Sequence, residues 1–349
     1  MKIVIDEKIP YIKDALEAMG HVVLSKPGVD ICKADLLGAE ALFVRTRTVC
    51  DASLLAGTPV RFIGTATIGY DHIDAAYCAA NGIMWTNAAG CNAGAVLQYV
   101  QSVVYEWARE TNTPVEGLVM GVVGVGEIGS RVAEWASSAG MRLLLNDPPR
   151  AARGDAGFVE LSELAAKCDI ITFHPTLSKG GDYPSYHLAG EAFLSSLQRC
   201  RLLINASRGP VVDNKALETL LVSGTAPRVV LDVWEGEPDI SLSLLNKVYV
   251  ATPHIAGYSA EGKINATKIV LAKFAEYFGC VGSVPLLELP APASPCVVAR
   301  SLPDALLEIY NPQSDSRVLK ANSQMFEELR NNYALRREPS AYKIELPKC

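Results

Sequence analysis

Three reactive side chains follow short apolar runs in the second half of the sequence. Arg208 lies in Asn-Ala-Ser-Arg-Gly-Pro, Glu237 in Asp-Val-Trp-Glu-Gly-Glu-Pro, and His254 in Thr-Pro-His-Ile-Ala-Gly-Tyr. An arginine can hold a substrate carboxylate through two parallel hydrogen bonds, and a neutral histidine can accept the proton of an alcohol as hydride departs. A carboxylate beside that histidine would orient the ring and stabilise the imidazolium. Together the three residues predict oxidation of a hydroxy acid.

Each of these residues also has an ordinary structural interpretation. Arg208 can be a surface ion-pair partner, Glu237 a solvated loop acid and His254 a hydrogen-bonded loop histidine. Taken singly, Arg208 and Glu237 fit the structural interpretation better than the catalytic one. Their joint presence downstream of a cofactor motif favours catalysis.

That cofactor motif is a glycine-rich turn. Gly124, Gly126 and Gly129 follow the apolar run 118–123 and open a segment with helical periodicity over 128–139. The first glycine permits a tight turn, the second lets the backbone approach a pyrophosphate, and the third allows close packing of helix on strand. The phosphates would lie at the amino end of the helix, where unpaired N–H groups and the helix dipole attract negative charge.

Asp147 ends the next apolar run, eighteen residues after Gly129. There a carboxylate can accept both hydroxyls of an adenosine ribose, and it would repel a 2′-phosphate, which favours NAD over NADP. The alternative is an aspartate that caps a helix or forms a turn before the two prolines that follow. Arg150 and Arg153 lie close in sequence and keep NADP open as an alternative.

Short apolar runs alternate with longer helical patterns, and these elements must position the reactive residues. In the first part of the chain we predict strands over 2–5, 41–44 and 61–64, a helix over 11–19 and a long helix over 93–109. The later runs are almost continuously apolar, as in strands that are buried on both faces. The fold class predicted is α/β, with two Rossmann-like or flavodoxin-like parallel-sheet domains. The later strands are predicted over 118–123, 142–146, 170–173, 202–205 and 229–231.

Length and composition limit the classes of function. A chain of 349 residues, 49% of them hydrophobic, can form two sizeable cores. The formal net charge of −6 and the scattered basic residues argue against nucleic acid, and no apolar run is long enough to cross a bilayer. Nine dispersed cysteines without a CxxC pair predict neither a disulfide framework nor a metal site. We expect a cytoplasmic enzyme that acts on a small molecule.

In these motifs and their order the sequence resembles the D-2-hydroxyacid dehydrogenase family over about residues 1–280. Members of the family carry, in this order, the glycine turn, an Arg in N-x-x-R-G, a Glu in D-V-x-x-x-E-P and a His in T-P-H-I-A-G. The resemblance implies that Arg208 and Glu237 are active-site residues, that His254 donates or accepts the proton, and that the cofactor is NAD. The implied cofactor contacts are Gly124, Gly126, Glu127, Ile128, Gly129, Asp147, Pro175, Thr176, Ala206, Ser207, Arg208, Asp232 and Gly257.

Within the family, the resemblance is strongest to members that oxidise a phosphorylated 2-hydroxy acid. It implies that Thr46, Thr67 and Tyr258 contact the substrate. From their placement at the end of an early strand, Arg45 and Arg47 are candidates for binding its phosphate, with ordinary ion pairs at a domain edge as the alternative. The segments that carry this resemblance are 44–46, 64–72, 90–92, 146–150, 233–238 and 254–259.

The end of the chain departs from the generic family pattern. A proline-rich linker after about residue 280 leads into a polar tail, in which residues 327–333 resemble a dimerisation region. We therefore expect a homodimer. The predicted domains are a substrate domain over 1–94 plus about 257–284, an NAD-binding domain over 95–256 and a C-terminal dimerisation region over 285–349.

The sequence leaves two other functions open. The chain can be a different D-2-hydroxyacid dehydrogenase, such as one that acts on 3-phosphoglycerate, or a non-catalytic protein that senses NAD. The complete set of Arg208, Glu237 and His254 argues against a sensor. One departure also affects the cofactor site, because Pro175 and Thr176 stand where the family has Thr-Pro-Leu, which leaves the hydroxyl contact expected there open.

Overall fold

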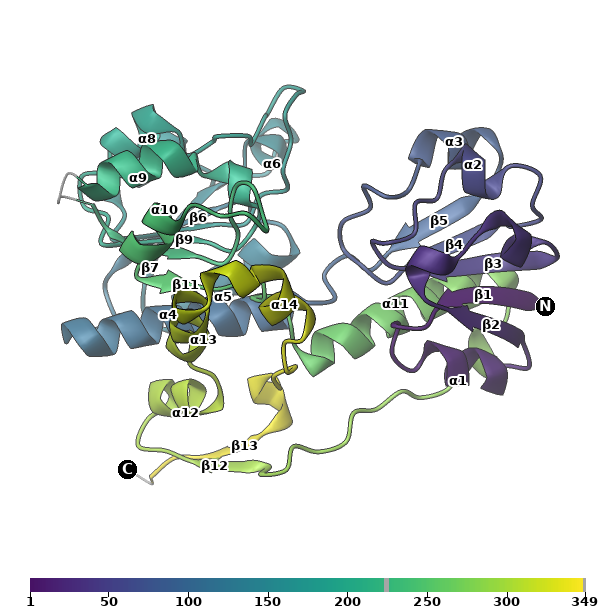
Figure 1. Cartoon of the computed structure of the whole chain (residues 1–349). Coiled ribbons are helices and arrows are strands. Elements are labelled where there is room, and N and C mark those ends of the chain that lie inside the picture. Colours follow the sequence, from purple (N-terminus) through teal and green to yellow (C-terminus); the bar gives the residue numbers. More distant parts are fainter. Residues whose placement is uncertain (223–225, 348–349) are drawn as a thin grey trace. The chain divides into compact units, whose positions relative to one another are not determined.

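The computed structural model describes residues 1–222 and 226–347, and it divides into two compact units (Figure 1). The first unit comprises Met1–Asn92 and Ser259–Ala291. The second comprises Ala93–Tyr258 and the C-terminal segment from Pro292 onward. Residues 348 and 349, at the end of the predicted dimerisation region, lie outside the described residues.

The first unit is built on a five-stranded parallel sheet of order β2-β1-β3-β4-β5. This is the flavodoxin-like order, in which the chain reverses direction across the sheet between β1 and β3. The three inner strands are almost completely buried, which explains why their apolar runs were recognisable. The strands are β1 (Lys2–Asp6), β2 (Val22–Lys26), β3 (Ala39–Val44), β4 (Phe62–Thr65) and β5 (Met84–Asn87), with helices α1 (Ile12–Ala18), α2 (Ala52–Leu55) and α3 (Ala75–Ala80) between them.

A helix from much later in the chain completes the core of this unit. Helix α11 (Ala260–Phe278) contacts β4 and β5, and its Phe274 lies with ring centroids 5.5 Å from Phe43 and 5.7 Å from Phe62. Ser259 caps its amino end by accepting a hydrogen bond from the Gly262 amide. Burying these aromatic rings is a large apolar contribution to the core. The first unit therefore depends on residues from both ends of its sequence.

The second unit contains a six-stranded parallel sheet of order β11-β10-β9-β8-β6-β7. An isolated parallel bridge joins Leu145 to Phe158 beyond β7, where the Rossmann order has its third strand. The two parallel sheets confirm the predicted fold class. The strands are β6 (Val119–Val123), β7 (Arg142–Asn146), β8 (Ile170–Phe173), β9 (Leu202–Asn205), β10 (Arg228–Leu231) and β11 (Val250–Ala251).

Helices of the second unit bury apolar faces against this sheet. The predicted long helix is α4 (Ala93–Thr111), which packs on α5 (Glu127–Ser138), the helix that follows the glycine turn. The shorter helices are α6 (Pro148–Ala152), α7 (Leu161–Lys167), α8 (Glu191–Ser195), α9 (Asn214–Val222) and α10 (Leu242–Lys247).

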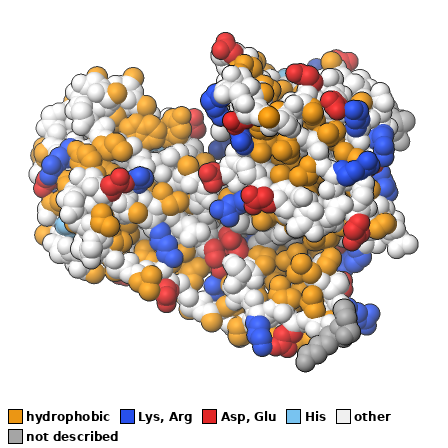
Figure 2. All heavy atoms as spheres, turned by 180° about the vertical axis from the view of Figure 1, so that it is seen from behind, with side chains coloured by type: hydrophobic (Ala, Val, Ile, Leu, Met, Phe, Trp, Pro, Cys, Tyr) orange, Lys and Arg blue, Asp and Glu red, His pale blue; other side chains and the backbone are white. Residues whose placement is uncertain are grey.

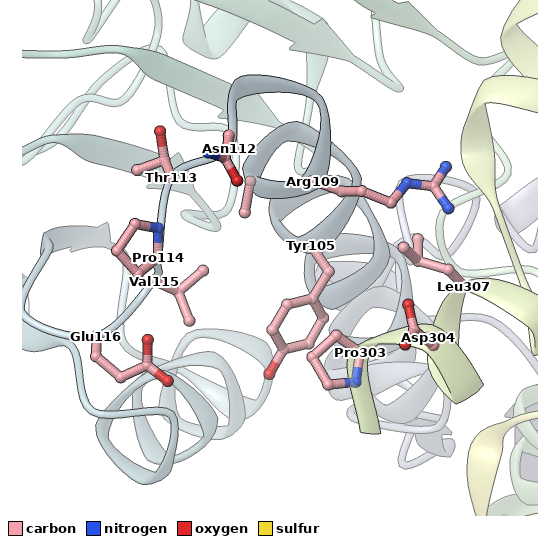
Figure 3. Close-up of a pocket in the computed structure, with 11 residues that line it drawn as sticks. Tyr105, Arg109, Asn112, Thr113, Pro114, Val115, Glu116, Pro303, Asp304 and Leu307 are labelled. Atoms are coloured by element: carbon pink, nitrogen blue, oxygen red, sulfur yellow. The ribbon is translucent and has the colours of Figure 1, made fainter. Parts of the chain in front are cut away.

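The C-terminal segment packs within the second unit. Helix α12 (Leu302–Ile309) contacts α4, and a hollow of about 390 Å³ lies between the end of α4 and the start of α12, lined by Tyr105, Arg109 and Leu307 (Figure 3). Helix α13 (Pro312–Ala321) lies against β11, where the Ser316 hydroxyl accepts a hydrogen bond from the Ala251 amide at 3.0 Å. The segment also contains α14 (Phe326–Asn331) and the parallel strands β12 (Cys296–Val298) and β13 (Lys343–Glu345).

On the face shown in Figure 2, acidic and basic side chains are interspersed with each other and with hydrophobic ones. Across the described residues, none of the helices combines the length and the apolar character that a membrane crossing requires.

Candidate active site

The glycine turn lies between β6 and α5, and its shape follows from contacts that a side chain would prevent. Gly124 has φ +81, and a Cβ there would lie 2.5 Å from the Pro175 nitrogen. A Cβ on Gly129 would collide with the carbonyl oxygen of Gly124, so helix and turn approach as closely as backbone allows. A Cβ on Gly126 would meet no atom within 4 Å. The open space above Gly126, at the amino end of α5, suits a pyrophosphate.

Asp147 directly follows the edge strand β7 and connects the turn to the next helix. Its Oδ2 accepts a hydrogen bond from the Val125 amide at 2.8 Å, and its Oδ1 accepts one from the Arg150 amide at 3.1 Å as the cap of α6. The capping role considered from the sequence is therefore present. A carboxylate has about four acceptor positions, so both oxygens keep capacity for ribose hydroxyls.

A cavity of about 480 Å³ opens beside this turn, and predicted cofactor contacts line it. Arg150 also lines it, but its guanidinium donates to Asp155 Oδ2 at 2.7 Å and to the Val125 carbonyl at 2.9 Å. These hydrogen bonds fix Arg150 beside the turn. Arg153 is the second arginine that lines the cavity. The lining includes Gly124, Gly126, Asp147, His174, Pro175 and Thr176.

His174 follows β8 at the wall of this cavity. Its Nε2 lies 2.9 Å from the Thr172 hydroxyl, and its Nδ1 is buried without a hydrogen-bond partner among the described residues. Burial lowers the pKa of this imidazole to about 3, so the ring is neutral at physiological pH.

Glu237 and His254 form a hydrogen-bonded pair. The His254 Nδ1 lies 2.7 Å from Glu237 Oε2, and the other carboxylate oxygen accepts a hydrogen bond from the Trp234 amide at 2.7 Å. Because an ionised carboxylate can only accept, Nδ1 carries the proton and Nε2 is the nitrogen available for proton exchange. The side chains are 17% and 26% exposed, so the pair is partly shielded yet open to a ligand.

The loop that carries His254 is held by a buried carboxylate. His254 has φ +59, an unfavourable conformation for a residue other than glycine. Asp232, at the end of β10, accepts hydrogen bonds from the amides of Ile255 and Ala256 at 2.8 and 3.0 Å and from the Thr252 hydroxyl at 2.6 Å. Burial raises the pKa of Asp232, while these donors oppose the shift. Asp232, a predicted cofactor contact, thus also fixes the backbone of the loop that carries His254.

Arg208 follows β9, the strand next to β10. The Asn205 side chain holds this segment by donating to the Arg208 carbonyl at 3.0 Å and accepting from the Ser207 amide at 3.2 Å. The neighbouring Gly209 packs directly on the backbone of Trp234, where a Cβ would collide. The segments of Arg208 and Glu237 are therefore in contact, at the edge of the sheet where open α/β proteins bind ligands.

The residues predicted to bind substrate fall in both units. Tyr258 belongs to the second unit with His254, whereas Arg45, Thr46 and Thr67 belong to the first. Arg45 and Thr46 follow β3, and the Thr46 side chain is exposed. The Thr67 hydroxyl lies 2.6 Å from that of Thr65 and donates to the Gly69 carbonyl at 2.9 Å. Their contacts with substrate remain predictions.

The structure brings together two groups that sequence spacing did not reveal. Arg330, from the predicted dimerisation region, lies with Nη1 3.8 Å from Glu237 Oε2. His187 lies between two acids, 2.7 Å from Glu235 and 3.5 Å from Asp213. No sequence motif marks either group, because the residues of each group come from distant segments that meet only in the folded chain. The second of them is a possible set of metal ligands by geometry, although its histidine already hydrogen-bonds Glu235.

The Rossmann-type sheet, the glycine turn and the His254–Glu237 pair define a dinucleotide-dependent dehydrogenase. Residues 92–256 match the family described as D-isomer specific 2-hydroxyacid dehydrogenase, NAD binding domain. Several relatives match the chain over almost its whole length. A protein from Bacteroides thetaiotaomicron is 48% identical over 99% of both chains, and one from Bacteroides fragilis is 46% identical over the full length of both. Both are erythronate-4-phosphate dehydrogenases, as is a Porphyromonas gingivalis protein that is 42% identical over 99% of this chain and 95% of its own. The chain belongs to the D-isomer specific 2-hydroxyacid dehydrogenase family, within its erythronate-4-phosphate dehydrogenase group.

Solved structures share the fold at lower identity. The NAD-bound 3-phosphoglycerate dehydrogenase of Entamoeba histolytica superposes with a TM-score of 0.63 at 23% identity and covers 83% of this chain and 99% of its own. The D-lactate dehydrogenase of Aquifex aeolicus gives 0.60 at 23% identity, over 81% of this chain and 97% of its own. Each of these structures leaves a little under a fifth of this chain unmatched.

Proposed function

We propose that this chain oxidises 4-phospho-D-erythronate with NAD to (R)-3-hydroxy-2-oxo-4-phosphobutanoate, a step of pyridoxal 5′-phosphate biosynthesis. The observation that carries the proposal is the His254–Glu237 pair, with Nδ1 and Oε2 2.7 Å apart. It lies in a chain that is similar over its whole length to erythronate-4-phosphate dehydrogenases. The pair supplies the base that alcohol oxidation requires.

Each catalytic residue has a role that follows from its chemistry. The Arg208 guanidinium binds the substrate carboxylate and polarises the adjacent carbon–oxygen bond. His254 Nε2 takes the proton of the C2 hydroxyl. Glu237 holds the ring by Nδ1 and stabilises the positive charge that the imidazole then carries. Tyr258, Thr46 and Thr67 are the proposed substrate contacts.

The residues around the glycine turn fit NAD, which when bound supplies the hydride acceptor. The space above Gly126 fits a pyrophosphate, and the Asp147 carboxylate fits the ribose hydroxyls. The carboxylate disfavours a 2′-phosphate. The complete proposed set is Gly124, Gly126, Glu127, Ile128, Gly129, Asp147, Pro175, Thr176, Ala206, Ser207, Arg208, Asp232 and Gly257.

NADH formation with different acids tests the function. We expect oxidation of 4-phospho-D-erythronate with NAD, a much lower kcat/KM for 3-phosphoglycerate, and weak use of NADP. A clear preference for 3-phosphoglycerate would contradict this proposal and indicate a 3-phosphoglycerate dehydrogenase instead. Tight NAD binding without NADH formation from any 2-hydroxy acid would indicate a sensor instead.

Arg45 and Arg47 are the proposed ligands of the substrate phosphate. Placed after β3, they can supply the cationic donors that a phosphate requires. We expect Arg45→Ala and Arg47→Ala to raise KM for the phosphorylated acid with little change in NAD affinity. An unchanged KM in both variants would exclude this role.

We further propose that the enzyme is a cytoplasmic homodimer that associates through region 285–349. The eight cysteines within the described residues are all free thiols, which suits a reducing compartment. Sedimentation of the full chain should give twice the monomer mass, and a monomer at micromolar concentration would contradict the proposed dimer.

A further inference from the structure

The C-terminal segment inserts a buried arginine behind the catalytic loop. Arg336 is 9% exposed, and its guanidinium donates hydrogen bonds to the carbonyl oxygen of Ile255 at 2.9 Å and to that of Ala256. On helix α4 it donates to the Ala95 carbonyl at 3.0 Å and, through Nε, to the Gln98 side-chain oxygen at 3.0 Å.

The planar fork of the guanidinium is fixed by these contacts and by a ring. Its centre lies 4.3 Å from the centroid of the Tyr310 ring, in cation–π geometry. The acceptors on the loop and on α4 are neutral oxygens, and the Tyr333 side chain is a further hydrogen-bond partner of the guanidinium. A buried guanidinium with this many directed hydrogen bonds is held in a single orientation. It therefore fixes the positions of the carbonyl groups to which it donates.

The two residues after His254 are thereby held at both their amide hydrogens and their carbonyl oxygens. Asp232 accepts the amide hydrogens of Ile255 and Ala256, and Arg336 binds the carbonyl oxygens of the same two residues. His254 itself has φ +59. Such a conformation costs about 1–3 kcal/mol and persists only where the surroundings over-determine it. The hydrogen bonds of Asp232 and Arg336 supply such surroundings for the two residues that follow His254.

We propose that Arg336 is a positioning residue for catalysis: it fixes the loop backbone so that His254 presents Nδ1 to Glu237 and Nε2 to the reacting hydroxyl. Arg336 acts through the loop and does not touch substrate. It lies outside residues 92–256, so the matched NAD-binding domain does not contain it. The inference rests on the proposed role of His254.

The test compares Arg336→Ala and Arg336→Lys with Arg317→Met. Arg317 is an exposed arginine of α13 whose guanidinium donates to Ser314 of the same helix, so it is a matched control from the same segment. Displacing a catalytic group by about 1 Å can cost on the order of 10²-fold in rate. We expect about that loss of kcat per NAD-binding site in Arg336→Ala, partial retention in Arg336→Lys and no change in Arg317→Met.

Three readouts separate positioning from a purely structural role. Added guanidinium should restore part of the activity of Arg336→Ala. The deuterium isotope effect with C2-deuterated substrate should increase, because the chemical step becomes slower. The low-field proton resonance of a histidine Nδ1 bonded to a carboxylate, assigned by its loss in His254→Gln, should weaken in the Arg336 variants without any substrate present.

The outcomes are distinct. The activity of the Arg336 variants can fall only because fewer molecules bind NAD, while the isotope effect and the histidine resonance stay unchanged. In that case Arg336 has a structural role only, and the inference fails. If wild-type protein forms no NADH, the proposed function fails, while the resonance still reports on positioning. If Arg336→Ala does not fold, the same measurements are made on Arg336→Lys and on Gln98→Met. The second of these variants removes one hydrogen-bond partner of Arg336.

Discussion

Replacing His174 with glutamine should remove part of the acid sensitivity of the second unit. The imidazole is buried at the wall of the cavity beside the glycine turn, its Nδ1 has no hydrogen-bond partner within the described part of the chain, and burial lowers its pKa to about 3. In the unfolded chain the pKa returns to its ordinary value near 6.5. Between these two values the unfolded chain binds a proton that the folded protein does not. Stability is therefore full above about pH 6.5 and falls as the pH drops toward 3.

The loss of stability on acidification follows from the difference between the pKa values of His174 in the folded and the unfolded chain. Each unit of pKa difference corresponds to about 1.4 kcal/mol, so lowering the pH from 7 to 5 should cost roughly 2 kcal/mol of unfolding free energy through His174 alone. Glutamine keeps an amide that can bond the Thr172 hydroxyl but does not titrate in this range. The variant should lose about 2 kcal/mol less than the wild type over the same change of pH.

Urea unfolding at pH 7 and pH 5 measures the difference. Trp107, Trp135 and Trp234, three of the four tryptophans, belong to the second unit, so their fluorescence reports its transition. His21→Gln is the control, because His21 lies in the first unit and should leave this transition unchanged. Equal losses in wild type and His174→Gln would refute the reasoning.

Three further changes test the cofactor site and the catalytic pair. In Asp147→Ser, which retains a helix-capping hydroxyl, NAD affinity measured by NADH fluorescence should fall about tenfold and the preference over NADP should narrow; an unchanged preference would contradict the assigned ribose contact. In Glu237→Gln, one amide oxygen cannot serve both His254 and Trp234, so kcat should fall roughly 10- to 100-fold, as expected for a charge-assisted bond of about 1.5–3 kcal/mol, while the Kd for NAD holds. Gly126→Ala should abolish NAD binding with little change in Tm, whereas Gly129→Ala should also lower Tm because its methyl group meets backbone; equal Tm values would argue against the close packing at Gly129.

Much of the fold was predictable because its inner strands are buried on both faces. The apolar runs at 170–173 and 202–205 coincide with β8 and β9. Strands β2 and β5 escaped prediction because they lie at the edges of their sheet, where Val22 is 70% exposed and Met84 44% exposed. Their sequences lack the continuous apolar character of inner strands.

The site was predictable where chemistry follows a strand within a few residues. Glu237 and His254 were paired from their motifs, and the structure places them in hydrogen-bond contact. Arg330 and Arg336 were not recognised as neighbours of the catalytic loop, because more than seventy residues separate each of them from it. Contacts of such range leave no local periodicity or spacing in the sequence.

The origin of α11 also sets the order in which the protein can fold during synthesis. Phe43 and Phe62 leave the ribosome early, but Phe274, which packs on both, follows more than two hundred residues later. At about 5–20 residues per second, the sheet of the first unit waits on the order of ten seconds or more for this covering helix. The part of the second unit that precedes α11, Ala93–Tyr258, is synthesised within that interval. The first segment to be translated therefore completes its core after most of the chain exists, and until then Phe43 and Phe62 lack the ring that packs on both of them.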